Sequence, residues 1–262
     1  MPEKLHDISV DDFTHPDDLA AIQALHNIPA VDRFVSNIED QSNQIIIRMT
    51  TLGSCVRLTD ANAAHVCEIV RNACDIIGYG QMPEIYTRRA YSLDVFPSGV
   101  ERPVIVIPDL ALRTLNDDLL YFTVGRALTR FKSDYLKFYL VAQLMITSSS
   151  IFPVVSDVVK LPLVGWMRKS ELTADRGGLL VCQNYKAAMR FLMCKAGMPY
   201  KETAQVSIPD YIEASQTSNT LTRAGKEAKT VLSSTGWIND RINELFLWYA
   251  KGSYDDLLEE YL

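Results

Sequence analysis

The sequence predicts an α+β fold that is mainly helical and contains one small mixed sheet. Long segments with apolar residues at helical spacing flank a short region, residues 81–110, that is rich in β-branched residues and prolines. A composition of 48% hydrophobic and 22% charged residues is that of an ordinary globular protein. The sequence contains neither an internal repeat nor a linker, so we expect residues 1–262 to form a single domain.

The N-terminal part, residues 1–80, is expected to be helical. Asp17-Asp18 and Asp60 each precede apolar residues at helical spacing, and acidic residues at such positions cap helices. Gly78 follows the second pattern and is a typical helix end. These signals predict helices at residues 19–25 and 60–77, with a β-branched run at residues 44–49 between them.

The small sheet is expected within residues 81–110. Residues 104–107 form an unbroken β-branched run between two prolines, which is typical of a buried strand. Pro97 ends the run before it, because proline donates no hydrogen bond to a sheet. The predicted strands are residues 84–88, 91–96 and 104–107.

Three longer helices are expected after the sheet. Asn116 precedes two aspartates and an apolar pattern, as at a capped helix start. Gly197 is a helix stop, and Ile242, Leu245 and Tyr249 lie at helical spacing near the C-terminus. The predicted helices are residues 115–146, 170–197 and 238–251, and the polar residues 214–229 are expected to form a mobile connection.

Charge and cysteine content argue against several kinds of binding partner and indicate a cellular location. The net charge is −6 and no basic run exceeds two residues, so we expect neither nucleic-acid binding nor attraction to an acidic membrane. Residues 1–19 carry six acidic residues and lack the apolar core of a signal peptide. Five cysteines without a CxxC spacing argue against disulfides and against a Cys-rich zinc site. The expected location is therefore the reducing cytoplasm.

Residues 138–166 form the most apolar stretch of the chain and require a membrane test. Ser148–Ser150, Pro153, Asp157 and Lys160 interrupt this stretch. No window of about 18–20 residues in it is free of charges and helix breakers. We therefore expect two short buried helices here, and the alternatives are a membrane segment or an interface.

Two motifs carry a resemblance to a known enzyme family. Asn116 opens a helix with acidic residues in its first turn, and residues 170–176 read Ser-Glu-Leu-Thr-Ala-Asp-Arg. Together they resemble the HtpX-like zinc metallopeptidases, a gluzincin family with a HExxH helix followed by an ExxxD helix. The resemblance covers most of the chain and implies a minimal zincin-like fold. Its other landmarks, in order, are residues 13–18 with Ile28-Pro29, residues 99–107, and residues 241–245 with Trp248-Tyr249.

The metal-binding motif of that family is replaced in this chain. In the family, the two histidines of HExxH bind zinc and the glutamate is the general base. The resemblance places Arg126-Ala127-Leu128-Thr129-Arg130 at these positions. A guanidinium has no lone pair for a metal, and alanine cannot act as a base. The four histidines of the chain, none of which forms an HxxxH pair, are His6, His15, His26 and His65.

Other family positions are partly kept. The resemblance implies that Glu171 occupies the third ligand position and Asp175 the position of its partner. Arg241 is retained, whereas Thr235 stands where the family has a histidine that acts at the transition state. Pro97 removes a backbone donor from the edge that would pair with an extended peptide.

The spacing of four charged residues predicts what replaces the ion. Arg126 and Arg130 lie one helical turn apart, and so do Glu171 and Asp175. We predict that these two cations pair with the two carboxylates and that the salt-bridge cluster takes over the bracing role of zinc. The alternative is that both arginines lie on a solvated helix face and that Glu171 is a relic.

The resemblance and the lost motif together predict a catalytically inactive metallopeptidase homologue, a pseudopeptidase. We expect it to bind a protein or peptide partner through the retained scaffold and to hold neither zinc nor another cofactor. Family membership alone would make the chain a zinc metalloendopeptidase. Two alternatives stay open: an active metal-dependent peptidase with a non-standard site, and a structural subunit of an assembly.

Overall fold

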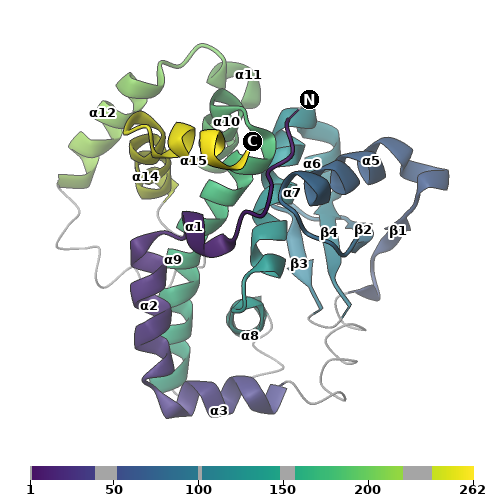
Figure 1. Ribbon diagram of the computed structural model, residues 1–262, viewed down its shortest axis with the longest axis vertical. Coiled ribbons are helices and arrows are strands. Elements are labelled where there is room, and N and C mark those ends of the chain that lie inside the picture. Colours follow the sequence, from purple (N-terminus) through teal and green to yellow (C-terminus); the bar gives the residue numbers. More distant parts are fainter. Residues whose placement is uncertain (1, 39–51, 100–101, 148–156, 221–237) are drawn as a thin grey trace.

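A four-stranded mixed sheet lies beside a larger helical part of the molecule (Figure 1). The computed structural model describes residues 2–38, 52–99, 102–147, 157–220 and 238–262. The predicted class, mainly helical α+β with a small mixed sheet, is confirmed for these residues. Their helices are α1 (Val10–Phe13), α2 (Pro16–His26), α3 (Pro29–Ile38), α5 (Asp60–Ile76), α6 (Asp109–Thr114), α7 (Asp117–Lys132), α8 (Leu136–Thr147), α9 (Asp157–Cys182), α10 (Tyr185–Lys195), α11 (Tyr200–Thr203), α12 (Ile208–Thr220), α14 (Ile238–Ala250) and α15 (Ser253–Tyr261).

The sheet has the order β1-β2-β4-β3. Strand β2 pairs antiparallel with β1 and parallel with β4, and β3 pairs antiparallel with β4. Every residue of β4 is buried, as its unbroken apolar run predicts. Pro97 lies in the edge strand β3, opposite Ile105. The strands are β1 (Val56–Leu58), β2 (Glu84–Arg88), β3 (Phe96–Ser98) and β4 (Val104–Pro108).

Two predictions for the sheet are wrong. The strand expected at residues 91–96 is displaced, since only residues 96–98 join the sheet. The reason is that Thr123 of α7 takes over the backbone: its hydroxyl accepts from Val95 N at 2.9 Å and donates to Leu93 O at 3.5 Å. The N-terminal part is also not wholly helical, because β1 belongs to it.

The long helices are divided differently from the prediction. The helix expected at residues 115–146 is two helices, because α7 ends at Lys132 and the extended backbone of Ser133 interrupts it before α8. The helix expected at residues 170–197 begins earlier, as α9, and ends at Cys182. Gln183 has a φ of 46° there, and the side chain of Asn184 caps α10. Residues 214–220 belong to α12 and are not a mobile connection.

Three other predicted helices are confirmed. The helices expected at residues 19–25, 60–77 and 238–251 are present as α2, α5 and α14. Helix α15 was not predicted. The β-branched run at residues 44–49 and the remainder of the 214–229 segment lie outside the described residues.

Glycines lie at the contact between helices α7 and α9, and two of them show how close the helices are. A Cβ on Gly125 would lie 2.6 Å from Cβ of Val181, and one on Gly178 would lie 2.8 Å from the backbone oxygen of Phe122. Neither separation is compatible with van der Waals contact. The glycines therefore let the two helices approach closely, which brings the side chains of α7 and α9 together further along the pair.

The main hydrophobic core includes Phe122, Ile105 and Phe191, and a second hydrophobic cluster lies where α2, α3 and α8 pack around the first half of α9 (Figure 1). Its members include Leu25, Val35, Phe138, Leu163 and Trp166. The prediction of two short buried helices in residues 138–166 is confirmed only in part: α8 is short and largely buried, whereas the second helix is the beginning of the 26-residue α9 and exposes Val158 and Leu161. None of the helices in the described ranges combines the length and the hydrophobicity needed to span a bilayer.

Candidate functional site

The four charged residues singled out by spacing meet between α7 and α9. Arg126 and Arg130 are 2% and 7% exposed, and Glu171 and Asp175 are 8% and 1% exposed. The alternative of a solvated helix face is therefore wrong. Charged side chains are almost never buried to this degree unless they are paired, so the partners of each group determine what the site can do.

Glu171 is held by cations on both of its oxygens. Its Oε2 accepts a hydrogen bond from Arg126 Nη2, and its Oε1 accepts one from Arg130 Nη2. Nη1 of Arg241 lies 3.2 Å from Oε2. The expected pairing of both arginines with Glu171 is thus present, and a third arginine adds to it.

Asp175 pairs mainly with Arg241 of α14. Nε and Nη2 of Arg241 donate to the two carboxylate oxygens at 2.7 and 2.6 Å, a two-pronged arrangement that fits the planar guanidinium. Nε of Arg126 lies 3.0 Å from Oδ1 of the same carboxylate. Asp175 therefore ties helices α14 and α7 to α9.

Two further residues join this group and were not predicted. Arg126 Nη1 donates to Asp94 Oδ1 at 2.7 Å, and Lys195 Nζ lies 2.5 Å from Asp94 Oδ2. Asp94 precedes Arg126 by 32 residues in a segment without periodicity, so no spacing rule relates the two. We call the seven residues the charge cluster: Asp94, Arg126, Arg130, Glu171, Asp175, Lys195 and Arg241.

Aromatic rings cover the arginines where carboxylates do not. The guanidinium carbon of Arg130 lies 4.2 Å from the ring centroid of Tyr139, and that of Arg126 lies 6.0 and 5.9 Å from Phe122 and Phe191. A cation over an aromatic face is stabilised by about 0.5–2 kcal/mol, more when it is desolvated. These contacts add to the stabilisation of buried positive charge.

The electrostatic balance of the cluster keeps the carboxylates of Glu171 and Asp94 ionised. Burial raises the pKa of Glu171, but Arg130, Arg126 and Arg241 outweigh it and hold that pKa well below its usual value. Burial acts likewise on Asp94, whose pKa is lowered to about 2 by Lys195 and Arg126. Burial lowers the pKa of Lys195 despite the opposing effect of Asp94.

A zinc ion does not fit this arrangement. Each oxygen of Glu171 is already held by an arginine, and arginine nitrogens offer no lone pair. Within the described ranges, no group of three or more His, Cys, Asp or Glu side chains is placed to hold a metal ion. Ala127, which the resemblance places at the position of the general base, is fully buried in the hydrophobic core.

The histidines lie apart from the cluster and from one another. His15 pairs with Glu244 at 3.3 Å and caps α2, where its Nδ1 accepts from Asp17 N. Two others pair with carboxylates at 3.3 and 2.8 Å, namely His26 with Asp32 and His65 with Asp117. His6 is exposed. None of the four is brought to Glu171, and Thr235 lies outside the described residues.

A cavity of about 130 Å³ adjoins the charge cluster. Five members of the cluster line it, and the remaining wall comes from the segment leading into β3, from α8 and from Met167 of α9. Arg130 also lines a smaller cavity of about 30 Å³ on its other side, together with Asp18 and Trp166. The full lining of the larger cavity is Asp94, Val95, Phe96, Arg126, Arg130, Tyr139, Gln143, Ile146, Met167, Glu171 and Lys195.

Comparison with known proteins corrects the expected location. The chain is 24% identical, over 221 residues, to a protein of Arabidopsis thaliana named plastoglobule-localized metallopeptidase 48, chloroplastic. The expectation of a cytoplasmic location is contradicted, because this relative is named as a chloroplast protein. The physical reason is that lack of a secretory apolar core argues against one export route and does not report on entry into an organelle.

The similarity covers different shares of the two proteins. The matched residues cover 81% of this chain, and the chain spans 63% of the length of the relative. No family model matches the chain, and no solved structure matches it. The chain is therefore similar to a metallopeptidase over most of its own length, and its charge cluster lies within a mainly helical α+β fold.

Proposed function

We propose that this protein is a non-catalytic homologue of the HtpX-like zinc metallopeptidases, a pseudopeptidase whose scaffold binds a protein or peptide partner. The observation that carries the proposal is the state of Glu171, which is bound on both oxygens by Arg126 and Arg130. In the HtpX-like enzymes the corresponding glutamate binds zinc. The similarity to a relative named as a metallopeptidase supports this ancestry.

Charge balance supports the idea that the arginines stand in for the ion. Zinc with two neutral histidines contributes two positive charges, and Arg126 with Arg130 contributes the same number. The carboxylates of Glu171 and Asp175 therefore keep their compensation in a buried site, where an unpaired charge would be costly. A cluster that joins α7, α9 and α14 also supplies the bracing that a structural ion would give.

The chemistry of the replaced positions supports inactivity. Hydrolysis by a zinc peptidase needs a metal-bound water and a nearby base. Here the position of the base is the methyl group of Ala127, which is buried in the core. Nη2 of Arg126 and of Arg130 already donates to the carboxylate that would complete a metal site.

Metal content is the decisive test. The full-length protein is incubated with zinc and desalted, and its zinc is measured by elemental mass spectrometry beside a Glu171→Gln variant and thermolysin as a positive control. We expect less than about 0.1 equivalent in the parent, because protein zinc sites bind tightly enough to survive desalting. Near one equivalent in the parent, lost in Glu171→Gln, would overturn the proposal and favour an active peptidase.

A restoring variant sharpens the test. A triple variant with Arg126→His, Ala127→Glu and Arg130→His rebuilds HExxH on α7, which packs against Glu171 of α9. We expect this triple variant to take up close to one equivalent of zinc provided that circular dichroism shows it folded. A folded triple variant without zinc would contradict the proposed correspondence between these positions and the metal ligands.

A further inference from the structure

The charge cluster carries more positive than negative charge. It contains four cations and three carboxylates, so its net charge is +1 when all seven groups are ionised. Asp18 lines the smaller cavity with Arg130 and interacts with it electrostatically, but no ion pair joins the two in the described part of the chain. Asp18 instead accepts hydrogen bonds from Trp166 Nε1 and Thr173 Oγ1. The surplus of one positive charge within the cluster favours the approach of an anion.

The carboxylates that line the larger cavity are already neutralised. Asp94 pairs with Arg126 through one oxygen and with Lys195 through the other. Glu171 is held on both oxygens by Arg126 and Arg130. These two acids therefore have little capacity left to attract a cation into the cavity.

Two of the cations, in contrast, have donors that no carboxylate of the cluster approaches, whereas the unbonded Nε of Arg126 and Nη1 of Arg241 lie 3.0 and 3.2 Å from Asp175 and Glu171. Nε of Arg130 is buried and has no hydrogen-bond acceptor among the described residues. The ammonium of Lys195 has three N–H donors and pairs with a single oxygen of Asp94, and its side chain is 15% exposed. A buried donor without an acceptor is unfavourable, so an acceptor at this place would be stabilising.

We infer that the cavity binds a carboxylate, which Arg130 and Lys195 hold from two sides. One carboxylate adds a single negative charge and so balances the net charge of the cluster. Its two oxygens match the two groups that have donors left. A phosphate dianion would overcompensate the charge and would bring more acceptor oxygens than these two groups can satisfy.

The rest of the wall selects an apolar tail. Val95, Ile146 and Met167 line the cavity beside the charged groups. Its volume of about 130 Å³ is slightly below that of the engineered cavity of about 150 Å³ that takes up benzene. The ligand is therefore a carboxylate with a short apolar chain, either a free acid or the C-terminus of a peptide. This inference rests on the proposed function, since it assigns the partner chemistry of the site that has lost zinc.

Calorimetric titration of the full-length protein tests the inference with sodium butyrate and, as a neutral control of the same shape, butyramide. Ionic strength is kept constant with sodium chloride. We expect saturable binding of butyrate with a Kd between about 0.1 and 10 mM, as a ligand of six heavy atoms allows. Butyramide is expected not to bind, because it carries no charge to balance the cluster.

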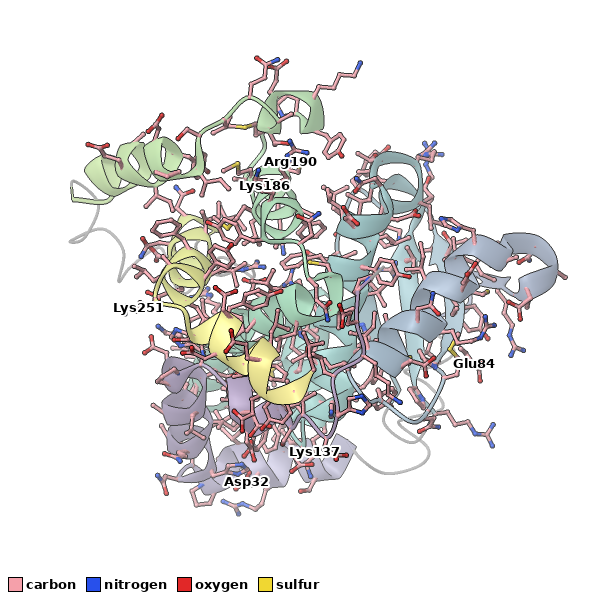
Figure 2. The ribbon with its side chains drawn as sticks, turned by 45° about the horizontal axis from the view of Figure 1, so that its top comes forward. Asp32, Glu84, Lys137, Lys186, Arg190 and Lys251 are labelled. Carbon is pink, nitrogen blue, oxygen red and sulfur yellow. The ribbon has the colours of Figure 1, made fainter. Side chains whose placement is uncertain are left out.

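Two variants locate the binding site. Lys195→Gln removes one of the two holding groups, and we expect it to weaken butyrate binding at least about tenfold. Its matched control is Lys186→Gln, an exposed position on the same helix α10, labelled in Figure 2. Because Lys195→Gln leaves Asp94 with one partner fewer, Ile146→Trp is tested as well. It keeps every charge, fills the cavity and is also expected to abolish binding.

Peptides distinguish the two sources of the carboxylate. A pentapeptide ending in valine is compared with the same peptide amidated at its C-terminus. Binding of only the free-acid peptide, more tightly than butyrate, identifies a peptide terminus as the ligand, and binding of butyrate alone identifies a free acid. Either outcome supports a carboxylate site.

Three outcomes would overturn the inference: equal binding of butyramide and butyrate, unchanged binding by folded Lys195→Gln and Ile146→Trp, or no binding to the parent at about 50 mM butyrate, well above the expected Kd. These failures differ from failure of the proposed function. Zinc in the parent would disprove the pseudopeptidase, whereas a zinc-free parent that binds no carboxylate would disprove only the ligand class.

Discussion

The two halves of helix α9 lie in opposite environments. In residues 157–169 one face packs on the second hydrophobic cluster, while Val158 and Leu161 on the other face are 64% and 40% exposed. In residues 170–182 every side chain is buried except that of Arg176, which is partly exposed. The first half is held by apolar contact on one side, and the second half is enclosed by α7, α10 and α14.

This difference in burial determines how much an ion pair contributes to stability in each half of α9. The first half of α9 has its Lys160 and Lys169 in solvent, where an ion pair contributes little. The second half places Glu171 and Asp175 among arginines, at positions that are almost inaccessible to solvent. Substitutions in the second half should therefore be far more costly than substitutions in the first, and the following experiments test that contrast.

The largest effect is expected from Asp175→Asn. The amide keeps the shape of the side chain but removes the charge that compensates Arg241 and Arg126, and breaking a buried pair costs about 3–5 kcal/mol. Urea unfolding measures the change in the free energy of unfolding. Asp60→Asn is the control, because Asp60 pairs with Arg71 at the surface and should cost less than about 1 kcal/mol. Equal effects of the two variants would remove the contrast between buried and exposed pairs.

Alanine at two glycines of α9 should act with opposite sign. Gly178→Ala drives a Cβ into the backbone of Phe122 and should destabilise the protein by about 1–3 kcal/mol. Gly165→Ala lies in the exposed half with no neighbouring atom within 4 Å of the new Cβ. It should stabilise the protein by about 0.5–1 kcal/mol, because alanine favours helix. Thermal melts of the two variants suffice, and a stable Gly178→Ala protein would show that α7 and α9 can move apart.

Acid should weaken the second half through Asp94. Its pKa is about 2 in the folded protein, below its ordinary value, so its stabilising contribution is present above about pH 4 and is lost as the pH falls towards 2. Glu171 acts in the same direction, whereas the raised pKa of Asp18 acts in the opposite one. Between pH 5 and 2, Asp94→Asn should lose about 2 kcal/mol less stability than the parent. Urea unfolding at a series of pH values measures both curves, and parallel curves would exclude Asp94 from the acid response.

The smallest effect is expected at Val158 in the exposed part of α9. Val158→Thr keeps the branched shape at a position that is 64% exposed, so the free energy of unfolding should change by less than about 0.5 kcal/mol. A loss of several kcal/mol in a urea titration would mean that this face is covered in solution.

Periodic features of the sequence were predictable and non-local ones were not. The run at residues 104–107 and the cap at Asn116 correctly predict β4 and the start of α7. The interruption at Ser133 and the displacement of β3 were missed, because both depend on tertiary hydrogen bonds and on local backbone conformation that no periodic pattern records.

The same distinction between periodic and non-local features applies to the charge cluster. Helical spacing brings Arg126 together with Arg130, and Glu171 together with Asp175. The resemblance placed these pairs opposite each other, since a single sequence contains no rule for contact between two helices. Asp94 and Lys195 were missed because they reach the cluster from a non-helical segment and from the end of α10.

The two-pronged contact between Arg241 and Asp175 sets an order of events during synthesis. These residues are 66 positions apart, and Arg241 is the last member of the cluster to leave the ribosome. At about 5–20 residues per second, Asp175 waits about 3–13 s for its main partner. During that interval Arg126 is the only other cation of the cluster that pairs with Asp175, so docking of α14 completes the charge balance of this carboxylate.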